Sequence, residues 1–205
     1  MKSKLKLVGF GLLGLVALVL LVGGVFAWTK VSAYDASMDK VYPIPPLDAV
    51  VRSSEPAVLA RGKHLVASLA SCGLNDCHGP DLGGGRLTDG GPIGTMQGPN
   101  ITQILPAYSD GELGRLIRHA VKKDQRSVRM MSMHEVNWMT DSDLVAVISY
   151  VRTVPRVERS NDGMHIGWFG KVMDRLDNIP IDVARRIDHD HIELGPAPSP
   201  TAAYG

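Results

Sequence analysis

The chain has 205 residues, enough for one domain of ordinary size or two small ones. Its 22 Lys and Arg nearly balance its 21 Asp and Glu, which argues against a nucleic-acid-binding arm or an acidic tail. Aromatic residues are scarce, with three Trp, five Tyr and three Phe, so the core has to be filled by aliphatic side chains and methionine, or by a group that is not protein. Two cysteines cannot form a disulfide framework.

The first 33 residues form a targeting segment. Three lysines within the first six residues precede the uncharged run Leu7–Thr29, which Lys30 closes. A helix of that run is about 34 Å long, enough to cross a hydrocarbon core of about 30 Å. The run is longer than the apolar part of a signal peptide, so we predict an uncleaved anchor in the cell inner membrane with everything beyond Lys30 exported. A cleaved signal peptide is the alternative, because residues 25–27 and 31–33 both resemble signal-peptidase sites.

The remainder divides into a linker over residues 34–52, a body over residues 53–155 and a C-terminal extension over residues 156–205. Three prolines within four positions of the linker favour an extended, semi-rigid spacer that lifts the body off the membrane. In the extension, residues 164–175 and 181–187 could each form a short helix, with Trp168 and Phe169 packing back on the body.

Three helices are expected in the body. The first begins at Pro56, which suits an initial helical turn. The second is opened by Ser109, with Glu112 completing a capping box, and the third begins at Thr140. We see no convincing strand, so the fold class is all-α. Gly62 should mark a close crossing of the first helix by the third.

A glycine-rich loop between the first two helices holds the sequence Cys72-Gly73-Leu74-Asn75-Asp76-Cys77-His78. Cys-x-x-Cys-His is the signature of covalent c-type haem attachment, in which two thiols add to the haem vinyl groups. Here four residues separate the thiols, so the insert has to bulge for both sulfurs to face one ring. We expect Cys72 and Cys77 to form thioethers to one covalent haem c, and His78 to ligate the iron.

Three other interpretations of the cysteines stay open. Haem attachment through Cys77 alone would leave Cys72 a thiol. A simple disulfide would suit an exported protein but would leave His78 unexplained. A zinc site would need the adjacent residues 77 and 78 to ligate one ion, which is rare.

With its surroundings, this motif resembles the cytochrome c family over about residues 54–155. Gly98-Pro99-Asn100-Ile101 is similar to the family's Gly-Pro-Asn-Leu stretch, and residues 130–152 are similar to the membrane-bound cytochromes that serve dehydrogenases. The resemblance implies a cytochrome c-like helical domain around the haem. It also implies that the carbonyl of Pro99 accepts a hydrogen bond from the haem-ligating histidine.

The sixth ligand of the iron is assigned by the same resemblance. In those cytochromes a methionine stands nine residues before the position of Thr140, which selects Met131. The proline that usually follows is replaced by Ser132, so Met133 is the alternative. Met139 is expected to fasten the entry of the third helix to the core, and His134 would give a site with two histidines.

Other polar groups have two interpretations each. One basic run comprises Arg115, Arg118, Lys122, Lys123, Arg126 and Arg129. We expect it to be a solvated helix face. The alternatives are a docking patch for an acidic partner and a set of cations near the haem propionates. His64 and His119 are expected at the surface or between helices. His189-Asp190-His191 is a solvated stretch, or otherwise a metal site.

The sequence therefore predicts a single-pass membrane cytochrome that transfers single electrons on the periplasmic side and is a carrier rather than an enzyme. Its expected partners are a protein donor, a protein acceptor, the membrane and further subunits of a respiratory or dehydrogenase complex, with no nucleic acid. The alternative is a haem enzyme or gas sensor with a labile sixth ligand.

Overall fold

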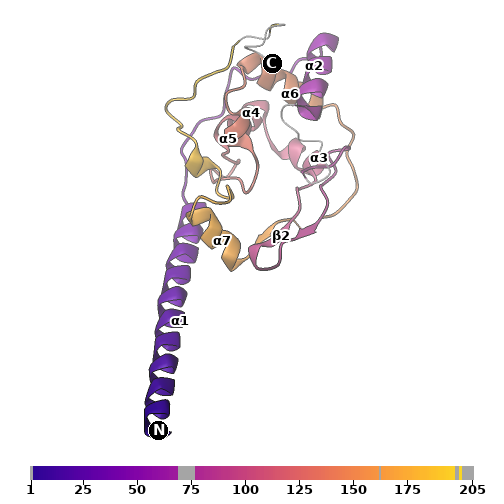
Figure 1. Ribbon diagram of the computed structural model, residues 1–205. Helices are drawn as coiled ribbons and strands as arrows, with labels where there is room; N and C mark the ends of the chain where they lie inside the picture. Colours follow the sequence, from indigo (N-terminus) through magenta and orange to yellow (C-terminus); the bar gives the residue numbers. More distant parts are fainter. Residues whose placement is uncertain (1, 69–76, 162, 197–198, 200–205) are drawn as a thin grey trace.

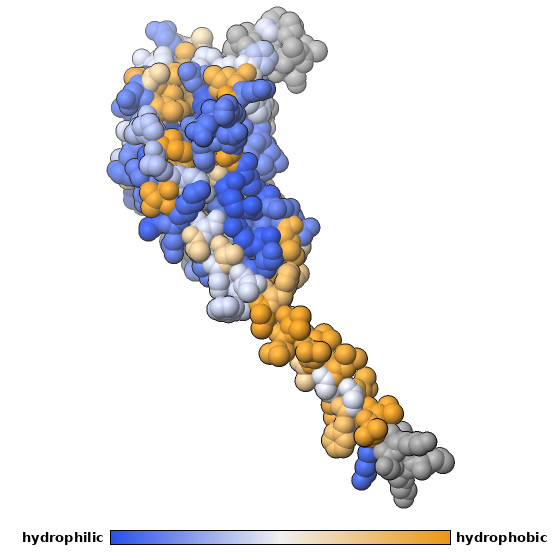
Figure 2. Space-filling view, turned by 90° about the vertical axis from the view of Figure 1, so that its left-hand side faces the viewer, coloured by the Kyte–Doolittle hydropathy of each residue, from blue (hydrophilic) through white to orange (hydrophobic). Residues whose placement is uncertain are grey.

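The computed structural model describes residues 2–68, 77–161, 163–196 and 199, and shows a body of short elements at one end of a single long helix (Figure 1). That helix, α1, has an apolar surface along most of its length, in contrast to the largely hydrophilic body (Figure 2). It is long and apolar enough to cross a membrane. The elements in chain order are α1 (Lys2–Met38), α2 (Pro56–Ala67), β1 (Thr88–Asp89), η1 (Gly91–Ile93), β2 (Gly94–Met96), α3 (Ile101–Ile104), η2 (Leu105–Ala107), α4 (Asp110–His119), α5 (Met133–Val136), α6 (Asp141–Val151), β3 (His165–Ile166), α7 (Trp168–Arg175) and η3 (Ala184–Arg186).

The three helices expected in the body are present as α2, α4 and α6, with the expected signals at their starts. Pro56 occupies the first position of α2. At α4 the Ser109 hydroxyl accepts the Glu112 N–H at 3.1 Å, and the Glu112 carboxylate accepts the Ser109 N–H at 2.7 Å. At α6 the Thr140 hydroxyl accepts the N–H of Asp143, in the first turn of the helix, at 3.2 Å. Local side-chain capping thus sets where α4 and α6 begin, whereas α2 begins at its proline without a side-chain cap.

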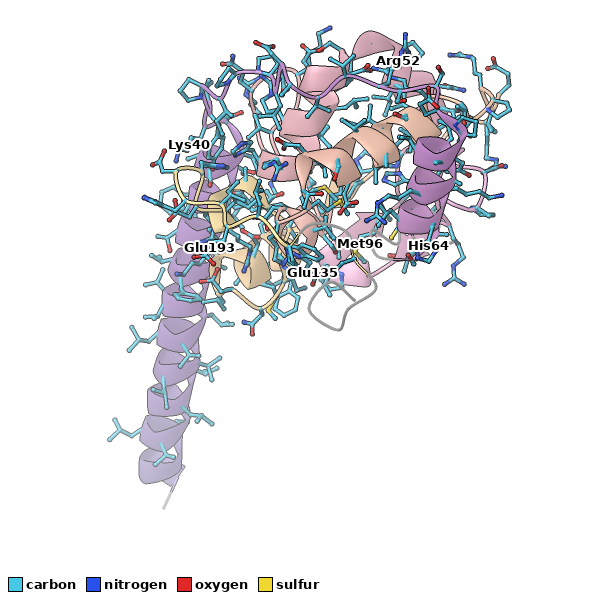
Figure 3. All side chains as sticks on the ribbon, turned by 90° about the horizontal axis from the view of Figure 1, so that it is seen from above. Lys40, Arg52, His64, Met96, Glu135 and Glu193 are labelled. Atoms are coloured by element: carbon cyan, nitrogen blue, oxygen red, sulfur yellow. The ribbon has the colours of Figure 1, made fainter. Side chains whose placement is uncertain are left out.

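The close helix crossing expected at Gly62 is present. Helices α2 and α6 lie side by side (Figures 1 and 3). A Cβ at Gly62 would overlap the carbonyl oxygen of Ala146 and lie 2.7 Å from the Cβ of Tyr150. The missing side chain therefore lets the two helices come together. Their contact forms part of one core that also includes Leu65, Val66 and Ile148.

The body is helix-rich, as expected, but it also contains a small sheet. Strands β1, β2 and β3 pair antiparallel in that order, with Thr88 opposite Met96 and Thr95 opposite His165. Each strand has only two or three residues, too few for an alternating hydrophobic pattern to appear in the sequence. Gly94 allows the pairing, because a Cβ there would overlap the carbonyl oxygen of His165.

The segment predicted to be a spacer is packed against the body instead. Helix α1 continues to Met38, and beyond it Tyr42 and Val50 are buried in the main core. The Tyr42 N–H donates to the carbonyl of Gln125 at 2.8 Å. The chain over residues 41–46 has no regular secondary structure, and it does not separate the body from α1.

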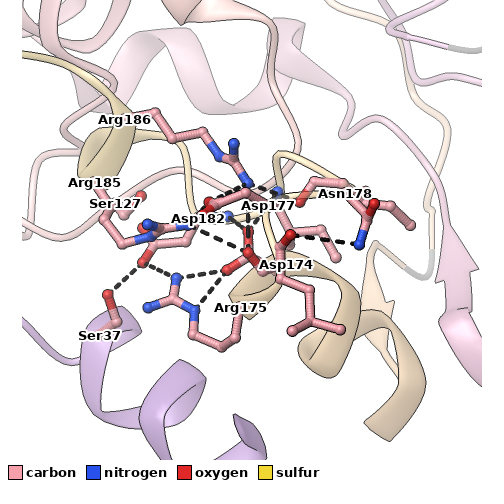
Figure 4. A network of polar contacts seen from close by, with 12 residues as sticks. Ser37, Ser127, Asp174, Arg175, Asp177, Asn178, Asp182, Arg185 and Arg186 are labelled. Atoms are coloured by element: carbon pink, nitrogen blue, oxygen red, sulfur yellow. Dashed lines mark hydrogen bonds and ion pairs between the residues drawn. The ribbon is translucent and has the colours of Figure 1, made fainter.

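The C-terminal extension fastens the body to the end of α1 (Figure 4). The Ser37 hydroxyl of α1 donates to Asp182 Oδ2 at 2.5 Å, and Arg175 of α7 donates to the same oxygen at 2.9 Å. Arg175 also pairs with the buried Asp174. Beside this network, a small second core contains Tyr34, Met38 and Ile181. The emerging end of α1 is therefore part of the folded body.

One expectation for the extension is wrong. Helix α7 and the 3-10 helix η3 are present, close to the predicted positions, but neither Trp168 nor Phe169 is buried against the body. Their side chains are 58% and 37% exposed.

Candidate functional site

The candidate site is built around His78, which directly follows Cys77. The structure describes the second half of the cysteine motif, and Cys72 lies outside the described residues. Cys77 is exposed, whereas His78 is only 6% exposed. A thiol at the surface next to a buried imidazole suits a cofactor that binds both.

The buried imidazole is held by a backbone carbonyl, at the residue that the sequence indicated. His78 Nδ1 lies 2.9 Å from the carbonyl oxygen of Pro99. Because the carbonyl can only accept, Nδ1 carries the proton and Nε2 has the lone pair. Burial lowers the pKa of His78, and the bond to Pro99 opposes part of this effect. The ring is thus neutral at pH 7, in the form that ligates a metal through Nε2.

Two loop segments approach each other closely to make this bond possible. A Cβ at Gly98 would overlap the backbone carbonyl of Cys77, so only glycine fits where the segments cross. The Gly84 N–H donates to the His78 carbonyl at 2.8 Å, and the Gly85 N–H donates to the Gly98 carbonyl at 3.0 Å. The glycines that gave the loop its irregular composition are those that bring Pro99 to His78.

The start of the extension forms the next layer of the site, which the sequence did not indicate. The Asn100 amide donates to the carbonyls of Val157 and Arg159, both at 2.9 Å. The Thr102 hydroxyl donates to Asn100 Oδ1 at 2.6 Å and accepts the Val157 N–H at 3.0 Å. The loop that carries Pro99 is therefore fixed by residues beyond the predicted domain end at residue 155. No local pattern in residues 156–161 points to this contact.

The methionines proposed for the sixth ligand differ in burial. Met133 is 3% exposed within the main core, and Met139 is fully buried there, as expected for its role at the entry of α6. Met131 is half-buried at the edge of the same core. His134 is also half-buried, and its Nδ1 is enclosed without a hydrogen-bond partner. Of the two methionines assigned by resemblance, Met131 keeps more of its surface available to a ligand.

The basic run is not a solvated helix face. The side chains of Arg115 and Arg118 are buried, and both donate to backbone carbonyls. Arg118 reaches the Met139 carbonyl at 2.8 Å and Asp141 Oδ1 at 2.6 Å, which joins α4 to the start of α6. The helical spacing of Arg115 and Arg118 suggested a charged surface, but Arg115 lies against the segment of Ile44, and Arg118 lies against the start of α6. A docking patch made of the whole run is therefore excluded.

Two histidines far apart in sequence lie together. His119 Nδ1 lies 3.2 Å from His189 Nδ1, and the His189 ring contacts Tyr42 edge-to-face with centroids 5.2 Å apart. Burial, with smaller contributions from His189, Arg118 and Arg115, lowers the pKa of His119 to about 4. Within the described ranges no three His, Cys, Asp or Glu side chains are grouped to hold a metal ion. His64 is exposed on α2, as expected.

Comparison with known proteins gives one distant relative. The chain is 29% identical over 107 residues to the fructose dehydrogenase cytochrome subunit of Gluconobacter japonicus. That protein is a cytochrome. The match covers 46% of this chain and 22% of the relative, so the chain spans about a fifth of the length of the protein it resembles. No family model and no solved structure matches. The match supports at most a distant relationship to cytochrome c-like proteins, and it suggests a role in electron transfer.

Proposed function

We propose that this protein is a membrane-anchored c-type cytochrome with one covalent haem, which transfers single electrons on the periplasmic side. The observation that carries the proposal is the buried His78, held by the Pro99 carbonyl with Nε2 as its lone-pair nitrogen. When bound, haem supplies a one-electron ferric/ferrous couple. The donor set fits that group, because a thiol and a neutral imidazole adjoin in sequence.

The chain's own residues then hold and tune the group. Cys72 and Cys77 would bind it covalently, and His78 and Met131 would ligate the iron, with Met133 as the alternative to Met131. The Pro99 carbonyl fixes the plane of the His78 ring and makes Nε2 more basic. A sulfur ligand raises the reduction potential relative to a second histidine.

The proposed location follows from α1. Its uncharged run is long enough to span the hydrocarbon core, and the lysines before it favour a cytoplasmic N-terminus. The body would then face the periplasm. The relative is named as a cytochrome subunit of a dehydrogenase. This name favours other subunits of a dehydrogenase or respiratory complex as the electron donor and acceptor of this protein.

Haem staining of a denaturing gel tests the covalent attachment. The full chain, expressed with a c-type maturation system, should stain at its own mass. A protein of the same mass that binds zinc, or that forms only a disulfide, would not stain and would refute the proposal.

Substitution of the methionines tests the axial ligand. Met131→Ala should abolish the far-red sulfur-to-ferric-iron band and allow CO to bind the reduced haem. Met130→Ala is the matched control, since Met130 is an exposed neighbour, and should leave both properties unchanged. If the band is lost in Met133→Ala and kept in Met131→Ala, the axial ligand is Met133 instead of Met131. A native protein that already binds CO rapidly would indicate a haem enzyme or gas sensor.

A further inference from the structure

The edge of the body formed by α7 carries two exposed aromatic side chains that electron transfer does not explain. Trp168 and Phe169 begin α7, and their rings meet edge-to-face with centroids 5.5 Å apart. The first turn of α7 has no acidic residue. An exposed pair of large aromatic rings is an apolar surface that favours a partner other than bulk water.

Helix α7 has a fixed position beside α1. Lys171 Nζ lies 2.7 Å from Asp35 Oδ1, and the same nitrogen lies 5.7 Å from the centre of the Tyr34 ring. The guanidinium carbon of Arg175 also lies 5.8 Å from the centre of the Tyr34 ring. The hydrogen bond from Ser37 to Asp182 holds the following segment to the same end of α1. The aromatic pair therefore cannot move independently of α1.

The length of α1 places this contact at the membrane boundary. The uncharged run ends at Thr29, and Asp35 is six residues further, about 9 Å along the helix. The headgroup layer on one side of a bilayer is about 5–8 Å thick. From the end of α1, α7 slopes away from the axis of that helix and toward the level of its N-terminal end, and α7 and β2 form the edge of the body nearest that end (Figure 1). This direction brings the first turn of α7 to the level of the headgroups.

We propose that Trp168 and Phe169 lie in the headgroup region of the outer leaflet, so that the C-terminal extension seats the body on the membrane surface. The proposal rests on the membrane anchor proposed above. Tryptophan prefers this interface, where its ring is half in apolar and half in polar surroundings. Trp28, exposed near the end of the uncharged run, marks the same boundary on α1. On the face that Figure 2 shows, apolar surface of α1 meets the edge of the body.

Spin labelling of the full chain in nanodiscs tests the proposal. The discs contain phosphatidylethanolamine and phosphatidylglycerol, with or without a lipid whose headgroup chelates nickel, and nitroxides are attached to single variants. Trp168→Cys probes the seating, and Trp28→Cys probes the anchor. Val51→Cys is the matched control, because Val51 is exposed and stands five residues before α2, which lies at the end of the body away from α1 (Figure 1). The unsubstituted chain gives the labelling background.

The nickel lipid should shorten spin relaxation at position 168 to an extent comparable with position 28, and should leave position 51 unchanged. An effect at 28 without one at 168 overturns the seating and leaves the anchor intact. No effect at either position overturns the anchor as well. An equal effect at all three positions overturns the seating, because it shows contact that is not specific to α7.

Discussion

Replacing Gly62 by alanine sets two physical effects against each other. Alanine is favoured over glycine in a helix interior by about 1 kcal/mol, so propensity alone predicts a more stable protein. The added Cβ, however, would overlap the Ala146 carbonyl oxygen and lie 2.7 Å from the Cβ of Tyr150. The Ala146 carbonyl is backbone of α6 and the Tyr150 Cβ is bonded directly to that backbone, so neither atom can move unless the helix moves.

The crossing decides the sign of the effect. Overpacking costs about 1–3 kcal/mol, and a clash with backbone lies at the upper end of that range. After the gain in propensity, we expect a net loss of about 2 kcal/mol in the free energy of unfolding. For a protein of this size that corresponds to a melting temperature lower by about 4–8 °C.

The measurement is thermal unfolding of the detergent-solubilised full chain, followed by far-UV circular dichroism. Ala60→Gly is the matched control, since Ala60 is exposed on the same helix and the reverse substitution there should cost about 1 kcal/mol. Both variants should melt below the wild type, although the substitutions are opposite. A Gly62→Ala protein that melts at a higher temperature than the wild type would refute the close crossing.

Three further predictions address the ends and the site of the chain. The mature protein should keep its N-terminal helix, and N-terminal sequencing that begins at Trp28 or Tyr34 would contradict this. Cys72→Ala should leave the haem held by one thioether and shift the pyridine haemochrome band, whereas an unchanged band would show that Cys72 was never attached. Because burial lowers the pKa of His119 from 6.5 to about 4, the unfolded chain binds a proton at this residue before the folded one does. The free energy of unfolding should therefore be highest above pH 6.5 and decline toward pH 4, with a loss of about 1 kcal/mol at pH 5.5. Urea titrations of His119→Asn should show a smaller decline over this range, and a pH profile equal to that of the wild type would count against the buried histidine pair.

Features with a local cause were predictable from the sequence. Ser109 and Thr140 cap their helices through backbone groups three residues away, so a short sequence window contains both partners. The contact between His78 and Pro99 was reached differently, through resemblance to a family, because a loop region of 20 residues, interrupted only by β1, η1 and β2, lies between the two. Composition and periodicity give no distance across such a loop.

Features that depend on tertiary contacts were missed. Arg115 and Arg118 have the spacing of a charged helix face, yet both are buried, and their guanidinium groups donate to carbonyls of other segments. His119 and His189 are 70 residues apart, and neither has a local pattern that indicates its partner. Trp168 and Phe169 were expected to pack back on the body, but both stay exposed, and the small second core beside α7 is filled by Tyr34, Met38 and Ile181.

The involvement of the last turns of α1 in the second core has a practical consequence for preparing a soluble fragment. A fragment that begins after Met38 would lose the hydroxyl of Ser37 that donates to the buried Asp182, and would expose Ile181 to water. One that begins at Lys30 keeps these contacts and removes the whole uncharged run. The boundary for crystallisation or solution work therefore lies within a continuous helix, eight residues before that helix ends.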